Sequence, residues 1–136
     1  MRKNQSGFTL LEIMLVVTII ALLLSAAIYK MAPSLDIAKT TRVRADISSI
    51  RTGLLSYSGL NGFYPTTEQG LEALVVQPSG DPAPSHWNKF MDEVPQDPWG
   101  SPYVYRCPGQ KNPTGYDLYS AGPDRKADTP DDDWGR

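Results

Sequence analysis

Hydrophobic and polar positions divide sharply in the first quarter of the chain. Polar and basic residues precede Gly7, an apolar run begins at Phe8, and no residue from Ile13 to Tyr29 is charged. A helix rises about 1.5 Å per residue, so this run is long enough to cross a hydrocarbon core of roughly 30 Å. The pattern predicts a transmembrane helix, and the basic residues before it predict a cytoplasmic N-terminus.

A different helical pattern follows Met31. Apolar residues recur at spacings of four, three, four and three, which is the period of an amphipathic helix: Val43, Ile47, Ile50, Leu54 and Tyr57. We expect the helix to continue out of the membrane, to pack this stripe on a domain of the same chain and to end between Gly59 and Gly62. Pro33 lacks a backbone N–H, which predicts a kink or a loosened turn in this helix.

From about Asn61 onward, glycine, proline and aromatic residues become frequent and long apolar runs vanish. Thr66 and Gln69 form a capping-box pattern that predicts a short helix, with an apolar face that ends before Pro78. Residues 103–107 and 116–120 have strand composition and flank a turn-rich region, which predicts an antiparallel pair packed on the long helix. The expected fold class is therefore α+β.

Composition excludes several classes of function. The chain of 136 residues has a net charge of −2, which does not favour nucleic-acid binding, and its single cysteine, Cys107, rules out an internal disulfide. We interpret Cys107 as a small packing residue and His86 as a surface residue. We find no nucleophile–base pair, phosphate-binding glycine loop or histidine pair, so the sequence predicts a protein that is not an enzyme.

Glu12 is an acidic residue near the start of the apolar run. It could lie at the level of the lipid headgroups, where it would favour the helix dipole. A carboxylate in a membrane helix otherwise costs a few kcal/mol unless it is paired. Cleavage after Gly7 would free an α-amine at Phe8 that could pair with Glu12 of a neighbouring subunit and fix the register between them. A secretory signal cleaved after the apolar run, near residues 25–27, is the alternative.

The stretch "GFTLLEIMLVV" resembles the class III signal of type IV pilins and pseudopilins. In that family a prepilin peptidase cuts after the glycine and methylates the new N-terminal phenylalanine. The resemblance implies cleavage between Gly7 and Phe8, N-methylation of Phe8, and a role for Glu12 in assembly.

Two further phrases, "YPTTEQGLEAL" and "PQDPWGSPYVY", resemble the major pseudopilin of the type II secretion system. The resemblance covers most of the chain and implies a type IV pilin-like α+β fold in which a long helix packs on a small antiparallel sheet. The implied parts are a leader peptide (1–7), a transmembrane and filament-core helix (8–30), its amphipathic continuation (31–60) and a periplasmic globular domain (61–136).

The function implied by this resemblance is structural. The chain would sit in the inner membrane with a periplasmic domain, and it would polymerise into a pseudopilus that drives folded proteins across the outer membrane. The implied partners are further copies of the chain, minor pseudopilins, the prepilin peptidase, and an inner-membrane platform with its ATPase. The alternative is a type IV pilin for adhesion or DNA uptake, but such pilins usually have a C-terminal disulfide loop, which one cysteine cannot form.

The C-terminal stretch "SAGPDRKADTPDDDWGR" concentrates five aspartates within ten residues. Closely spaced oxygen ligands suit calcium, although the spacing is not that of an EF-hand and a solvated acidic loop is equally consistent with it. The resemblance implies a calcium site in the fold. Its expected ligands are the carbonyl of Ala121 and the side chains of Asp124, Asp131 and Asp132, with Asp128 or Thr129 completing the set. Arg125 and Asp133 depart from the family pattern, which often has glycine and an aliphatic residue there.

Overall fold

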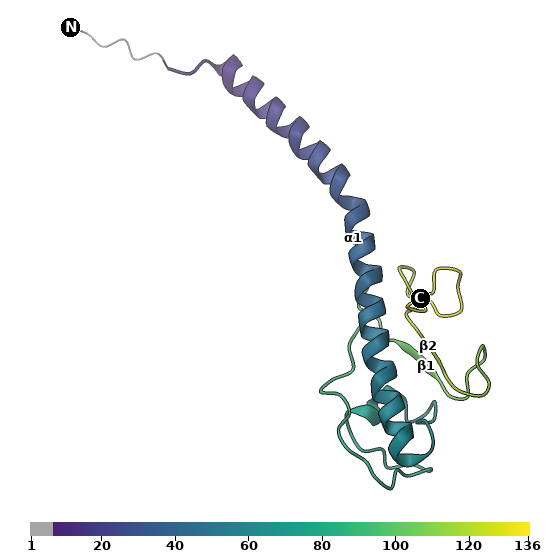
Figure 1. Ribbon diagram of the computed structural model, residues 1–136. Coiled ribbons are helices and arrows are strands. Elements are labelled where there is room, and N and C mark those ends of the chain that lie inside the picture. The colour runs from purple at the N-terminus through teal and green to yellow at the C-terminus, as the bar shows by residue number, and fades with distance from the viewer. Residues whose placement is uncertain (1–6) are drawn as a thin grey trace. The chain divides into compact units, whose positions relative to one another are not determined.

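The computed structural model describes residues 7–136, apart from the side chains of residues 31–34. Its elements, in chain order, are the helix α1 (Leu10–Asn61), the 3₁₀ helix η1 (Leu71–Leu74) and the strands β1 (Val104–Arg106) and β2 (Asp117–Tyr119), as Figure 1 shows. The chain divides into two compact units, one ending at Ile37 and the other formed by Ala38–Arg136, and α1 contributes to both.

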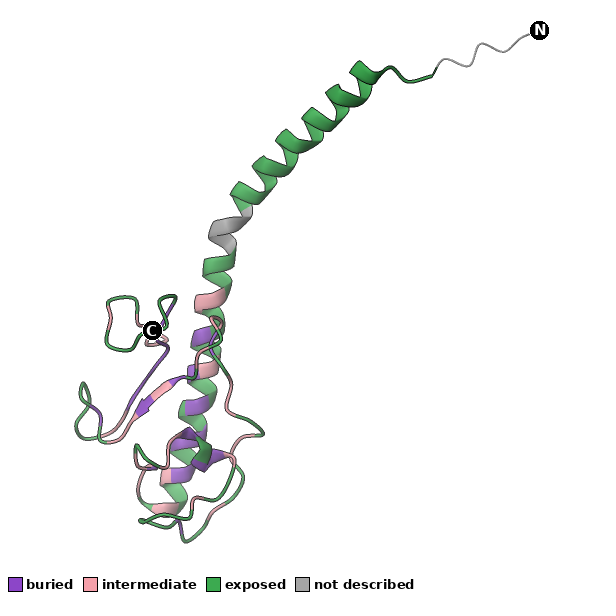
Figure 2. Ribbon diagram, turned by 180° about the vertical axis from the view of Figure 1, so that it is seen from behind, coloured by how far each residue is buried: buried purple, intermediate pink, exposed green. Residues whose placement is uncertain are grey.

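The first unit is an apolar helix with no cover from its own chain. Every side chain described from residue 7 to residue 30 is exposed, as the green part of α1 in Figure 2 shows. The most apolar window of α1 has a mean hydropathy of 2.7, and none of it is buried. By length and composition this helix can cross a membrane, as its sequence predicts.

The start of α1 is capped by Thr9. The hydroxyl of Thr9 accepts a hydrogen bond from the backbone N–H of Glu12 at 3.3 Å. Threonine followed three residues later by glutamate is the capping-box spacing, and the acidic side chain in the first turn suits the helix dipole. Glu12 therefore has a local role in the helix, whatever its role in assembly.

The second unit is built around the amphipathic part of α1, where the predicted stripe is confirmed. All five of its side chains have 0% exposed surface. They form one core with apolar side chains from η1, from both strands and from the residue before β1, chiefly Leu71, Leu74, Tyr103, Tyr105 and Leu118.

The predicted end of the long helix is also confirmed. α1 ends at Asn61, and Gly62 follows in the left-handed region at φ 82°. Glycine reaches this conformation without a steric penalty and is common just after a helix. The predicted kink at Pro33 falls within residues 31–34, which lie outside the described side chains, and it stays a prediction.

The capping box of Thr66 and Gln69 forms, but the element after it is not the helix we expected. The N–H of Gln69 donates to the Thr66 hydroxyl at 3.2 Å, and the N–H of Thr66 donates to Gln69 Oε1 at 3.1 Å. Gly70 then takes φ 60° and ψ −166°, which no α-helix accommodates. A turn and the 3₁₀ helix η1 replace the single helix for this reason.

The predicted antiparallel pair is confirmed, with each strand shorter by one residue at both ends. The strands pair Val104 with Tyr119, Tyr105 with Leu118, and Arg106 with Asp117. A two-stranded sheet is marginally stable alone, so it depends on its packing against α1. His86 is exposed and Cys107 packs half-buried against the core, as we expected.

Two neighbouring leucines of α1 test the role of the stripe. Leu54 is fully buried, whereas Leu55 is 66% exposed. We expect Leu54→Ala to lower the free energy of unfolding of the second unit by about 2–5 kcal/mol, because it removes buried methyl groups and leaves a cavity. Leu55→Ala should change it by no more than about 0.5 kcal/mol. Thermal unfolding of the fragment 34–136 measures both values, and equal losses would contradict the assignment of the core.

Candidate functional site

The predicted cleavage bond lies in non-helical backbone. Residues 7–9 precede α1, and Phe8 is 78% exposed. A Cβ added at Gly7 would meet no atom within 4 Å. A peptidase can therefore reach the Gly7–Phe8 bond without unfolding a helix.

Glu12 lies one turn beyond this bond and is exposed. Within the described part of the chain its carboxylate has no hydrogen-bond or ion-pair partner. An unpaired carboxylate on an apolar helix is costly in lipid, so this side chain needs a partner from another molecule or a place at the membrane surface. The capping role of Thr9 was not predicted from the sequence, although the Thr-x-x-Glu spacing indicates it.

The second candidate site is the acidic loop at residues 121–132, which two backbone hydrogen bonds close at its base. Ser120 N–H donates to the carbonyl of Asp133 at 2.9 Å, and Asp133 N–H donates to the carbonyl of Ser120 at 3.0 Å. β2 ends at Tyr119, so this base continues directly from the sheet.

A buried carboxylate outside the loop supports its base. Asp97 is 3% exposed and accepts a hydrogen bond from the Ser120 hydroxyl at 2.6 Å. The Ser120 hydroxyl oxygen in turn accepts from the N–H of Gly122 at 3.1 Å. The other oxygen of Asp97 accepts from the N–H groups of Trp99 and Ser101. The sequence analysis missed this residue, although aspartate at the start of a Pro-Trp-Gly turn is a recognisable turn signal.

Hydrogen bonds link several of the predicted ligands within the loop. Asp131 accepts from the Thr129 hydroxyl at 2.7 Å and from the N–H of Asp124 at 3.2 Å. The Thr129 hydrogen bond is the main cause of a lowered pKa at Asp131. One oxygen of Asp132 accepts from the N–H of Asp128 at 3.0 Å. The other, Oδ1, is buried without a hydrogen-bond partner, which is an unusual state for a carboxylate oxygen.

The carboxylate of Asp128 is engaged elsewhere. Arg106 of β1 donates to both of its oxygens, at 2.9 and 2.8 Å, and the Tyr119 hydroxyl donates at 3.1 Å. The bond from Arg106 is the main cause of a lowered pKa at Asp128, while burial raises the pKa of Tyr119 to about 12. The predicted ligand Asp128 therefore already has a cationic partner in this chain.

The carboxylates of the acidic loop can hold a hard cation only if backbone carbonyl oxygens serve as further ligands. Among the residues described, no three His, Cys, Asp or Glu side chains lie close enough together to hold a metal ion. Calcium accepts carbonyl oxygens as well as carboxylates, and the unpartnered Oδ1 of Asp132 is the kind of oxygen that it binds. The loop is therefore compatible with calcium if carbonyls, such as that predicted at Ala121, supply the remaining ligands.

Two non-glycine residues of the loop adopt left-handed backbone. Arg125 has φ 59° and Asp128 has φ 67°. Aspartate tolerates this region and glycine occupies it freely, whereas arginine does so at a cost of roughly 1–2 kcal/mol. A glycine at position 125, as the resemblance implies for the family, would adopt this conformation without that cost.

Gly122 offers a test of how tightly the loop closes. It has φ 68°, and an added Cβ would clash with the carbonyl oxygen of Asp131 and lie 3.0 Å from its Oδ2. We expect Gly122→Ala to lower the free energy of unfolding by about 2–4 kcal/mol, because strain and overpacking add. Gly80→Ala, where an added Cβ would meet nothing within 4 Å, should be neutral or slightly stabilising. Chemical denaturation of the fragment 34–136 compares the two, and a neutral Gly122→Ala would refute the tight closure.

The sequence matches two family models that together cover nearly the whole chain. Residues 2–28 match the prokaryotic N-terminal methylation motif. Residues 30–135 match protein G of the type II secretion system.

Curated relatives and a solved structure agree with these matches. The chain is 46% identical over 134 residues to the type II secretion system core protein G of Pseudomonas aeruginosa, covering 97% of this chain and 93% of that protein. It is 42% identical over 136 residues to the core protein G of Escherichia coli strain K12, covering 97% and 92%. The crystal structure of the major pseudopilin from the type 2 secretion system of enterohaemorrhagic Escherichia coli matches with a TM-score of 0.68 and 38% identity, over 75% of this chain and 90% of that one.

Proposed function

This chain belongs to the family of type II secretion system protein G, and from that premise we propose that it polymerises into a periplasmic filament whose growth drives folded proteins across the outer membrane. The chain is a subunit of the type II secretion pseudopilus, and its family is one of structural subunits. The match over residues 30–135 sets aside the alternative of an adhesive or DNA-uptake pilin.

One observation supports polymerisation above the others: the apolar first part of α1 has no cover from its own chain. Lipid covers such a helix while the unassembled subunit lies in the inner membrane. In a filament, the same helices of neighbouring subunits cover one another. Because lipid tails and apolar side chains are similar solvents, moving a helix between them releases little free energy by itself. An ATPase coupled to an inner-membrane platform would therefore supply the work of extraction.

Processing and register are linked in this proposal. The prepilin peptidase cuts the exposed, non-helical bond after Gly7 and methylates the new amine of Phe8. That amine, which is a cation, pairs with the unpartnered carboxylate of Glu12 on a neighbouring subunit. An unpaired charge is costly in apolar surroundings. The pair therefore favours the one axial offset between neighbouring helices that brings the amine and the carboxylate together.

The acidic loop would bind calcium through Asp124, Asp131 and Asp132, with the carbonyl of Ala121 and with Thr129 or Asp128 as further oxygens. A bound cation supplies positive charge that offsets the repulsion between these carboxylates. The buried oxygen of Asp132 that lacks a partner and the oxygen-rich donor set support this assignment. The Arg106 ion pair makes Asp128 the weakest candidate of the set.

The Glu12 side chain tests the assembly mechanism. We expect Glu12→Ala and Glu12→Gln to be cut and methylated normally but to lower filament yield and secretion at least about tenfold, because an unpaired Phe8 amine costs a few kcal/mol. Thr9→Ala is the control, because it removes the helix cap and keeps the charge. Mass spectrometry of the mature chain and sedimentation of sheared filaments are the measurements.

Two results would refute this mechanism. Normal filaments from Glu12→Gln would show that the charge is dispensable. A mature N-terminus beyond Ala26 would show that the apolar helix is removed by an ordinary signal peptidase, and no polymerising rod would remain.

Calcium binding can be measured on the fragment 34–136. With a dissociation constant of about 10⁻⁴–10⁻³ M, 10 mM calcium should stabilise the fold by about 1.4–2.7 kcal/mol and raise the melting temperature by several degrees. Chelation should reverse the shift, and Asp132→Asn should abolish it. Asp92→Asn, outside the loop, should keep it. An unchanged melting temperature in the wild-type fragment would exclude the site.

A further inference from the structure

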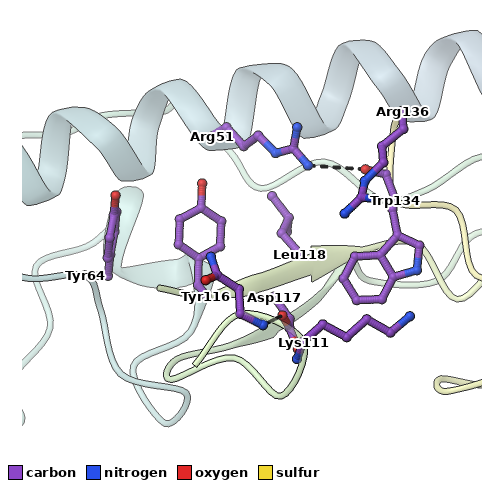
Figure 3. Close-up of a pocket in the computed structure, with 9 residues that line it drawn as sticks. Arg51, Tyr64, Lys111, Tyr116, Asp117, Leu118, Trp134 and Arg136 are labelled. Atoms are coloured by element: carbon purple, nitrogen blue, oxygen red, sulfur yellow. Dashed lines mark hydrogen bonds between the residues drawn. The ribbon is translucent and has the colours of Figure 1, made fainter. Parts of the chain in front are cut away.

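The second unit contains a pocket that belongs neither to the N-terminal region nor to the acidic loop. It has a volume of about 370 Å³ and lies between α1, the turn before β2, β2 itself and the C-terminal segment (Figure 3). Three basic side chains from these separate segments line it: Arg51, Lys111 and Arg136.

The positive charge in this pocket is only partly balanced by the chain. In the described part of the protein, none of the three basic side chains forms an ion pair. Arg51 donates to the carbonyl of Trp134, at 3.3 Å, and the Lys111 ammonium lies 4.0 Å from the centroid of the Trp134 ring.

Asp117 is the one carboxylate side chain among the lining residues, so the pocket has three basic side chains and one acidic side chain. Asp117 is 3% exposed, and its oxygens accept hydrogen bonds from the N–H groups of three successive residues of the turn: Gln110, Lys111 and Asn112, at 2.7, 2.9 and 3.1 Å. These bonds hold the carboxylate in the turn, where its negative charge offsets one of the three positive side-chain charges and leaves an excess of two. The pocket therefore attracts an external anion.

Aromatic contacts give the pocket fixed walls. The rings of Tyr64 and Tyr116 pack edge to face with centroids 4.9 Å apart, and Trp134 stacks on Tyr119 at 4.4 Å. Figure 3 shows both tyrosines standing between the turn and α1, on the side from which Arg51 extends. Guanidinium and ammonium groups held by such walls form charge-assisted hydrogen bonds to carboxylates with little further ordering.

We propose that this pocket binds a carboxylate side chain from a second copy of this chain in the pseudopilus. The inference rests on the proposed function, because a filament places copies of the second unit against one another. The same unit offers suitable anions: four exposed carboxylates outside the acidic loop that have no side-chain partner in the described residues, namely Glu68, Glu72, Asp81 and Glu93.

The two halves of this contact are made by different residues of the unit. The pocket is lined by residues 51, 64, 111–112, 116–118, 134 and 136, and none of the four carboxylates is among them. A contact between two different patches is heterologous, and repeating it builds a helical filament where the rotation does not close. A self-complementary contact would instead close a dimer.

Charge reversal in the full-length chain tests the pocket. In cells that carry the assembly machinery, filaments are sheared, sedimented and quantified for Arg51→Glu and Lys111→Glu. We expect each to lower the sedimented fraction at least five-fold. Arg44→Glu is the matched control, because Arg44 is an exposed arginine two turns earlier on α1 that does not line the pocket, and its yield should stay within two-fold of the wild type.

Restoration of the charge pair identifies the partner. Each of the four carboxylates is replaced by lysine in the Arg51→Glu chain, so that every copy carries the swapped pair. We expect one of the four double variants to recover at least half of the wild-type yield.

Several results would overturn the proposal. Wild-type yields from Arg51→Glu and Lys111→Glu would do so, and so would recovery from none of the four swaps. Thermal unfolding of the mature chain in detergent checks the fold of each variant. If Arg51→Glu has a lowered melting temperature, the filament yield of Lys111→Glu is the test of the proposal. Failure of the wild-type chain itself to form filaments would refute the proposed function instead.

Discussion

The burial of one stripe of α1 holds the second unit together. The unit has two strands of three residues each and a 3₁₀ helix of four, and none of these elements is stable alone. Five stripe residues with no exposed surface supply the common face on which they pack. Tyr103 adds a polar tie to the same helix, because its hydroxyl donates to Asp46 at 2.8 Å. The loops keep their places because α1 provides a continuous apolar surface.

The same helix changes its chemistry along its length, and its two parts need different surroundings. From residue 10 to residue 29 mostly apolar side chains cover all faces and are exposed, whereas from Val43 to Tyr57 only one face is apolar and that face is buried. The second pattern is satisfied within the chain. The first can be satisfied only by lipid or by other helices. A subunit that moves from membrane to filament needs a helix of this kind, because neither environment demands a change in its fold.

The features that local pattern determines could be predicted from the sequence: the stripe, the end of α1, the strands and the Thr66–Gln69 capping box. The element after that box was predicted incorrectly, because the conformation of Gly70 depends on the turn around it. The roles of Asp97 and Arg106 could not be predicted, since their partners Ser120 and Asp128 lie 23 and 22 residues away. Contacts between distant loops produce no regular spacing of residue types in the sequence. The pattern therefore identifies candidate site residues but not the side chains that bind and position them.

These two distant contacts decide what a cation could do in the acidic loop. Hydrogen bonds between Ser120 and Asp133 close its base, and Asp97 accepts a further bond from the Ser120 hydroxyl. Arg106 already neutralises Asp128. The repulsion that remains is among the other aspartates, of which Asp132 contributes a buried oxygen without a partner. A cation would therefore order the part of the loop beyond its base, and its contribution to stability should be smaller than in a loop without the arginine.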